Sequence, residues 1–319
     1  MGYTRPLDFE KDYLELRERL DALKDMAREK ALDLGDEIAS LEAKVAALKE
    51  QRYRSLTAWQ KVQIARHIER PTTRDFIDAL CEDFVELHGD RCFGDDAAIV
   101  GGLARFEGRP VTVVGHLKGR DTAENLQRHF GMPHPEGYRK ALRLMKQAEK
   151  FGRPVICFID TPGAYPGTGA EERGQGWAIS QSLMQMALLR VPTVSIVIGE
   201  GGSGGALALG VADRVLMLSY AVYSVISPEG CASILWKDSR RAEQMAESLK
   251  LTAADLLALG IIDEVVEEPL EGAHRAPQQT FAAVRERLRW HLHDLEGLEA
   301  TRRVELRYQR LRRIGAFEE

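Results

Sequence analysis

The feature that most constrains the fold is a series of short apolar runs that alternate with glycine turns and helical segments between residues 99 and 266. The run at 193–198 contains only Val, Ile, one Thr and one Ser. Such near-continuous apolar strands are typical of strands covered on both faces, which favours an α/β fold. We predict strands at residues 98–104, 110–115, 155–160, 193–198 and 214–218.

Both ends of the chain are predicted to be helical. Residues 8–53 are rich in charge, and apolar residues recur at helical spacing on either side of Gly35. This pattern predicts a helical hairpin whose apolar stripe packs on the body of the protein or on a partner chain. Residues 278–308 are again helical and rich in arginine. We expect an N-terminal helical segment (1–70), a core (71–275) and C-terminal helices (276–319).

Charge and hydropathy exclude several classes of protein. The 319 residues carry 44 Lys and Arg against 49 Asp and Glu, a formal charge of −5, without the uniform basic footprint that duplex binding needs. No stretch approaches the ~18 uncharged apolar residues of a membrane span. The first residues lack the apolar core of a secretion signal. We expect a cytoplasmic protein that binds neither nucleic acid nor membrane.

The cysteines and histidines do not indicate a metal site. The four cysteines have no CxxC spacing, which argues against a zinc ribbon or a disulfide framework and fits a reducing cytosol. His129 and His134 flank a short loop, and their spacing does not place them on one helical face. We interpret them as structural or solvated histidines and predict no metal in this chain.

The densest chemical signal is the glycine cluster GEGGSGGA at residues 199–206, directly after a predicted strand. A helix that begins at such a turn presents unpaired N–H groups and a positive dipole end, which bind anions or developing oxyanions. The cluster fits the dinucleotide pattern GxGxxG, but no acid stands about 20 residues later to hold a ribose. A phosphate-binding P-loop is excluded because Gly205 and Ala206 stand where Lys and Ser or Thr are required.

The same cluster leaves an alternative open. Gly201, Ser203 and Gly205 fit the nucleophile elbow of α/β-hydrolases, and Asp263 and His274 follow in the required order. A stand-alone serine hydrolase using Ser203 is therefore an alternative, and a scaffold that binds partners through its helices is another. Against the hydrolase, the helix after Ser203 has room for barely two turns.

Two further segments are candidates for the site. The loop DTPGAYPGTGAEE at residues 160–172 also follows a buried strand, and its prolines and glycines suit a loop that preorganises backbone amides beside a substrate. A helix is predicted from Pro135. One face of it is basic, which favours anionic substrate or partner groups or, alternatively, an ordinary surface helix: Arg139, Arg143, Lys146 and Lys150.

Four sequence blocks occur in a fixed order: FGMP with PEGYRKA (130–133 and 135–141), FIDTPGAYPG (158–167), IGEGGSGGA (198–206) and YSVISPEGCA (223–232). Together they closely resemble the alpha subunit of the bacterial acetyl-coenzyme A carboxylase carboxyltransferase. The resemblance spans nearly the whole chain. Only the first fifty or so residues are looser.

The resemblance implies a crotonase-like α/β fold, a superhelix of ββα units with helical N-terminal and C-terminal extensions. It implies a transferase that moves the carboxyl group of carboxybiotin to acetyl-CoA, which yields malonyl-CoA for fatty acid biosynthesis. Biotin would arrive on a separate biotin carboxyl carrier protein, and the ATP-dependent biotin carboxylase is another polypeptide. A zinc-ribbon-containing carboxyltransferase beta subunit would complete an α2β2 heterotetramer.

The resemblance also implies the site residues. It assigns the oxyanion hole to the backbone amides of Gly204 and Gly205, facing biotin. No side-chain base is required, because the biotin anion can itself remove the methyl proton of acetyl-CoA. The other residues implied to bind biotin or substrate are Gly201, Gly202, Ser203, Gly163, Ala164, Tyr165 and Arg139.

Overall fold

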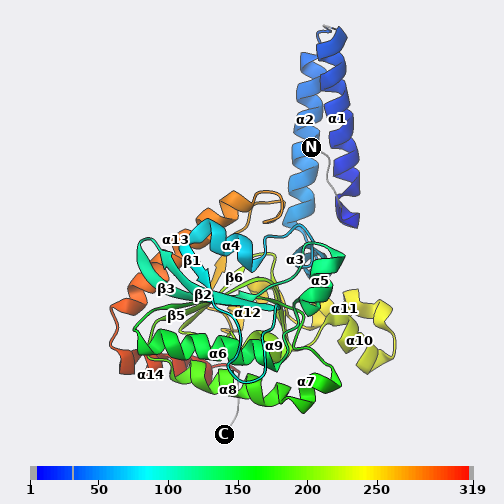
Figure 1. Cartoon of the computed structure of the whole chain (residues 1–319). Helices are drawn as coiled ribbons and strands as arrows, with labels where there is room; N and C mark the ends of the chain where they lie inside the picture. Colours follow the sequence, from blue (N-terminus) through cyan, green and yellow to red (C-terminus); the bar gives the residue numbers. More distant parts are fainter. Residues whose placement is uncertain (1–5, 31, 316–319) are drawn as a thin grey trace.

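The computed structural model describes residues 6–30 and 32–315 (Figure 1). Within these residues, eight strands form one sheet in the order β1-β2-β3-β4-β5-β6-β8, and β7 pairs with the end of β5. The strands are β1 (Glu82–Glu86), β2 (Ile99–Phe106), β3 (Arg109–His116), β4 (Val155–Thr161), β5 (Thr193–Gly202), β6 (Arg214–Leu218), β7 (Val222–Ser224) and β8 (Glu264–Val266).

The sheet is antiparallel at one edge and parallel elsewhere. β1, β2 and β3 pair antiparallel, whereas β3, β4, β5, β6 and β8 run parallel. Every residue of the central strand β4 is buried, as expected for a strand covered on both faces. All five predicted strands are confirmed. β5 is longer than predicted because Gly201 and Gly202 continue the pairing with β4 and β7.

Helices cover both faces of the sheet (Figure 1). α4 and α13 pack against one face, while α6 lies on β2 and β3 and carries α8 on its outer side. The α-helices are α1 (Lys11–Lys30), α2 (Gly35–Arg54), α3 (Ala58–Ala65), α4 (Thr73–Leu80), α5 (Thr122–Gln127), α6 (Pro135–Lys150), α7 (Thr168–Glu172), α8 (Gln175–Leu188), α9 (Ser203–Leu207), α10 (Pro228–Trp236), α11 (Ala242–Ser248), α12 (Ala253–Ala258), α13 (Pro277–Glu296) and α14 (Ala300–Arg312). Short 3-10 turns are η1 (Asp8–Glu10), η2 (His129–Gly131) and η3 (Ser239–Arg241).

The N-terminal hairpin is confirmed and projects from the body (Figure 1). The apolar stripes of α1 and α2 face each other and are mostly half-buried, so they pack mainly within the hairpin rather than on the sheet. Only the base is anchored. There Tyr13 and Tyr53 are buried beside Ile64, and the Tyr13 hydroxyl donates to Glu271 Oε1 over 3.0 Å.

The C-terminal helices are also confirmed as α13 and α14, and a buried ion pair fixes α14 to the body. Arg307 is 1% exposed, and its Nε donates to Asp213 Oδ1 over 2.9 Å. Within the described residues, no helix has the length and apolar character needed to cross a membrane.

Candidate active site

The glycine cluster forms the junction between β5 and α9. Ser203, the first residue of α9, has φ of +51°, a left-handed conformation that is uncommon for a non-glycine residue. The N-cap is Gly202, which has no side chain to bond the N–H groups of the first turn. Because the first N–H groups of a helix lack intrahelical partners, those of Gly204 and Gly205 are suited to hold an anion.

The second predicted loop lies directly against this junction. A Cβ added to Gly202 would lie 2.1 Å from the Pro162 carbonyl oxygen, and one added to Gly205 would lie 2.6 Å from the Gly163 carbonyl carbon. The same added atom on Gly205 would lie 2.7 Å from the Ala164 nitrogen. The two segments therefore pack backbone to backbone, and only glycine allows this approach.

Gly205 is held from its other sides by two buried side chains. His116 Nε2 lies 3.2 Å from the Gly205 carbonyl oxygen. Burial lowers the pKa of His116 to about 3, so its neutral ring donates this hydrogen bond. A Cβ on Gly205 would also lie 2.9 Å from the hydroxyl of Tyr138, which is fully buried. The peptide between Gly205 and Ala206 is thus fixed before any ligand binds.

Tyr165 lies at the outer end of the second loop and is held by the segment before α6. Its N–H donates to the Pro133 carbonyl over 3.1 Å, and its ring stacks on His134 with centroids 4.1 Å apart. Gln175 Nε2 donates to both carbonyls, that of Pro133 (2.8 Å) and that of Tyr165 (3.0 Å). The loop therefore has a defined conformation.

Arg139 engages a different part of the protein. Its Nε donates to Asp90 Oδ2 over 2.7 Å and its Nη1 to the Arg173 carbonyl over 3.1 Å. Burial raises the pKa of Asp90, but three backbone N–H groups and Arg139 outweigh it and bring the pKa to about 2. The next basic residue of α6, Arg143, donates to the Gly89 carbonyl over 3.0 Å. This part of the basic face thus holds the loop before β2, while Lys146 and Lys150 are exposed.

A charge network that the sequence analysis missed joins the two glycine segments. Lys118 Nζ lies 2.7 Å from Asp160 Oδ1 and 2.8 Å from Glu200 Oε2. Arg66 Nε lies 2.6 Å from Glu200 Oε1, and its Nη1 lies 2.5 Å from Glu229 Oε1. Burial raises the pKa of Glu200, but Lys118 and Arg66 bring it to about 2.

The network lines a cavity of about 280 Å³ that also contacts Pro162. Lys118, Asp160 and Glu200 all lie at or just beyond the carboxyl ends of parallel strands, where ligands bind in open α/β sheets. In the sequence, these three residues could have been noticed only because they stand at or just after the ends of predicted strands. The pairing of β3 with β4 and of β4 with β5, which no local pattern in the sequence indicates, brings these three residues together.

The serine-hydrolase alternative fails on geometry. Both ring nitrogens of His274 lack a hydrogen-bond partner in the described part of the chain, and the ring stacks on His67 with centroids 4.2 Å apart. Asp263 instead accepts a hydrogen bond from the Val215 N–H over 2.6 Å. Ser203 is therefore not joined to these two residues as a catalytic triad requires.

Comparison with known proteins assigns the family. Residues 6–315 match the family described as acetyl co-enzyme A carboxylase carboxyltransferase-like. The chain belongs to this carboxyltransferase family. It is 57% identical over 314 residues to the acetyl-coenzyme A carboxylase carboxyl transferase subunit alpha of Thermus thermophilus, covering 98% of this chain and 99% of the relative. The corresponding subunit of Halalkalibacterium halodurans is 57% identical over 311 residues, covering 98% and 96%.

Solved structures confirm the fold of this carboxyltransferase-family chain. Transcarboxylase 12S with methylmalonyl-coenzyme A bound aligns with a TM-score of 0.55 at 20% identity, over 69% of this chain and 43% of that one. The beta subunit of P. aeruginosa geranyl-CoA carboxylase aligns with a TM-score of 0.57 at 18% identity, over 77% and 45%. The crotonase-like fold is therefore confirmed.

Proposed function

We propose that this chain acts as the alpha subunit of an acetyl-CoA carboxylase carboxyltransferase and holds the developing oxyanion at the start of α9. The observation that carries the proposal is the uncapped glycine turn: Gly202 and Gly205 pack against the 162–164 backbone, and no capping side chain bonds the first-turn N–H groups, among them those of Gly204 and Gly205. Preorganised N–H donors at a point where negative charge develops lower the barrier of acyl and carboxyl transfer.

The residues around the turn have separate roles in this proposal. Biotin, when bound, supplies the carboxyl group and a ureido oxygen on which negative charge develops. The amides of Gly204 and Gly205 donate to that oxygen. Gly201, Gly202 and Ser203 shape the turn, and His116 fixes the peptide that follows Gly205. Gly163, Ala164 and Tyr165 form the facing wall, and Arg139 anchors its surroundings through Asp90.

We further propose that the site is completed by a beta subunit. Large apolar side chains are exposed on α8, which contacts α9 (Trp177, Met184 and Leu188, 71%, 67% and 62% exposed), and on α10 (Ile234 and Leu235, 63% and 62%). Exposed apolar patches of this kind favour a protein partner. An α2β2 heterotetramer in the cytoplasm, served by a biotin carboxyl carrier protein and a biotin carboxylase, accounts for them. We also propose that the chain is divided into an N-terminal helical segment (1–70), a core (71–275) and C-terminal helices (276–319).

Reconstitution tests the function. The chain is mixed with a carboxyltransferase beta subunit, acetyl-CoA and carboxybiotin, and malonyl-CoA is measured. The mixture should form malonyl-CoA, and the chain alone should not. A correctly folded mixture without activity would overturn the proposal.

The Ser203 hydroxyl can be tested separately from the backbone amides of the turn. Because its neighbours supply backbone donors, Ser203→Ala should leave most of the malonyl-CoA rate, and a serine-reactive fluorophosphonate should not label the wild-type chain. Loss of the rate together with labelling of the wild type would contradict the backbone assignment.

A further inference from the structure

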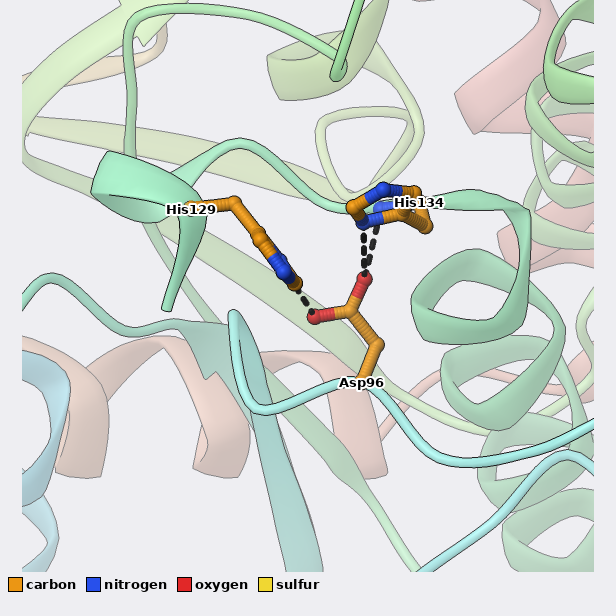
Figure 2. Close-up of side chains that lie close together, drawn as sticks. All are labelled: Asp96, His129 and His134. Carbon is orange, nitrogen blue, oxygen red and sulfur yellow. Dashed lines mark hydrogen bonds and ion pairs between the residues drawn. The ribbon is translucent and has the colours of Figure 1, made fainter. Parts of the chain in front are cut away.

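Asp96 meets two histidines that follow it by more than thirty residues, His129 and His134 (Figure 2). The cluster lies beside Tyr165, on which the His134 ring stacks. Asp96 precedes β2, His129 lies in η2, and His134 is the N-cap of α6. Figure 2 shows the two imidazoles at either side of the Asp96 carboxylate, with His129 Nδ1 3.7 Å from Oδ1 and His134 Nδ1 3.5 Å from Oδ2. One ligand atom from each residue lies within 4.8 Å of the others.

We propose that Asp96, His129 and His134 form a binding site for one divalent transition-metal ion of the Zn²⁺ type. Two imidazole nitrogens and a carboxylate oxygen are a donor set that zinc prefers, and three protein ligands leave a fourth position for water. Two atoms bound to one Zn²⁺ at about 2.0–2.1 Å and a tetrahedral angle lie about 3.4 Å apart. The His134–Asp96 and His129–Asp96 distances are close to that value and longer than a good hydrogen bond.

The carboxylate is fixed in the orientation that the site needs. Asp96 is 3% exposed, and it accepts hydrogen bonds from the N–H groups of Ala98 (2.7 Å, at Oδ1) and His134 (2.5 Å, at Oδ2). A carboxylate has about four lone-pair positions, so these two bonds leave capacity at both oxygens. The Asp96 carboxylate is therefore held in place, and each of its oxygens still has a lone pair available for a metal ion.

His129 is held by an unusual backbone conformation. His129, Phe130 and Gly131 have φ values of +49°, +56° and +75°. Two successive non-glycine residues in the left-handed region are strained, and such strain clusters at functional sites. Within the described residues, His129 Nδ1 is buried and has no hydrogen-bond partner. A strained turn therefore directs a buried, unpaired ring nitrogen toward a buried carboxylate.

The sequence did not reveal this arrangement. The spacing of His129 and His134 does not fit one helical face, and Asp96 lies more than thirty residues earlier. The convergence depends on α6 packing across β2, which places its N-terminus beside the residues before that strand. Helical spacing alone therefore favours two structural histidines.

A metal ion at this position would fasten the segment before α6 to the Tyr165 loop. His134 stacks on Tyr165, and the His129 ring contacts the same tyrosine edge-on with centroids 5.5 Å apart. The Tyr165 N–H donates to the Pro133 carbonyl, next to His134. Fixing both imidazoles would therefore fix Tyr165. The ion would be structural for the loop, and binding it requires no partner subunit.

Metal binding by the full chain tests the site. The chain is stripped with a chelator and titrated with Zn²⁺ by calorimetry, and with Co²⁺ while visible absorption is recorded. We expect one ion per chain and a rise in Tm on Zn²⁺ addition. His129→Ala and His134→Ala should each weaken Zn²⁺ binding about ten-fold or more, because loss of a supporting residue alone costs that much. Circular dichroism of the metal-free variants checks that they are folded.

His88→Ala is the matched control. His88 also lies beside a carboxylate, 3.0 Å from Asp95 Oδ2, but it is 64% exposed in its side chain and lies outside the three-residue cluster. Binding should be unchanged in this variant. The site is overturned if the wild type binds no Zn²⁺ at micromolar concentrations, if both cluster variants bind as the wild type does, or if His88→Ala removes binding equally. Asp96→Asn, which keeps the hydrogen-bonding shape, should weaken binding without unfolding the chain.

Discussion

At the scale of single residues, Lys118 is the side chain that joins the two glycine segments. It contacts Asp160 at the end of β4 and Glu200 near the end of β5, and the Glu200 N–H also donates to Asp160 Oδ1 over 2.9 Å. The Lys118 side chain is 20% exposed, and those of the two carboxylates are 10% and 12% exposed. Removing the ammonium would leave two neighbouring carboxylates poorly solvated and repelling each other.

Lys118→Met should therefore destabilise the protein by about 2–3 kcal/mol, measured by urea unfolding. It should also lower the rate of malonyl-CoA formation in the reconstituted mixture, because the two segments lose their common anchor. The control is Lys24→Met on α1, which breaks only the exposed pair with Glu42. Equal stability of the two variants would contradict the anchoring role.

The same network predicts how stability depends on pH. The pKa of Glu200 is about 2 in the folded chain against an ordinary 4.5, so its contribution to stability is fully present above pH 4.5 and is lost as the pH falls towards 2. The Tm of the wild type should fall over this window. In Lys118→Met the pKa of Glu200 rises, so this part of the acid dependence should shrink. Parallel plots of Tm against pH for the two proteins would contradict the proposed effect of Lys118 on the pKa of Glu200.

The sequence indicated the turn but not its surroundings. The turn is visible in the sequence as a glycine cluster, because at Gly202 and Gly205 only glycine permits the close backbone approach that the structure contains. His116 and Lys118 could not be identified, since their roles depend on β3 lying beside β4. Long-range pairing of this kind leaves no local pattern in the sequence.

At the scale of elements, the strongly periodic segments were predictable and the short ones were not. The predictions of β4, β5 and α6 were correct, because the burial of these elements determines where their apolar residues stand. β1 (Glu82–Glu86) carries three acids on an exposed edge and resembles a loop in sequence. β7 and β8 have three residues each, too few for any periodicity.

The hairpin of α1 and α2 is attached through its base, so one residue there should control its docking. Tyr13 is fully buried, and its hydroxyl donates to Glu271, which also accepts a 3.0 Å hydrogen bond from Lys49. Tyr13→Ala should cost about 3 kcal/mol and make residues 8–54 more sensitive to protease. Tyr308→Ala, at a 58% exposed position on α14, is the control. Unchanged proteolysis in Tyr13→Ala would show that other contacts hold the hairpin.

At the scale of the whole molecule, the well-covered sheet contrasts with two helices whose apolar side chains are exposed. One sheet is covered on both faces, while α8 and α10 keep large apolar side chains exposed. The glycine turn before α9 lies beside α8, because Gly204 is close to Ile179 on that helix. A partner that covers α8 would therefore also enclose the turn, which is consistent with the proposal that a beta subunit completes the site.

The most direct test of the account is the malonyl-CoA rate of Gly204→Ala in the reconstituted mixture. The added Cβ would lie 3.6 Å from Ile179, an ordinary contact, so the fold should persist, whereas the same change at Gly205 would clash with the 163–164 backbone. Gly35→Ala, with a similar 3.6 Å contact to Asp33 in the remote hairpin, is the control. We predict a loss on the order of 100-fold for Gly204→Ala, because the added methyl group would stand beside the two N–H donors and hold the biotin oxygen away from them, and none for Gly35→Ala. A wild-type rate in folded Gly204→Ala would contradict the assignment of the oxyanion hole to the start of α9.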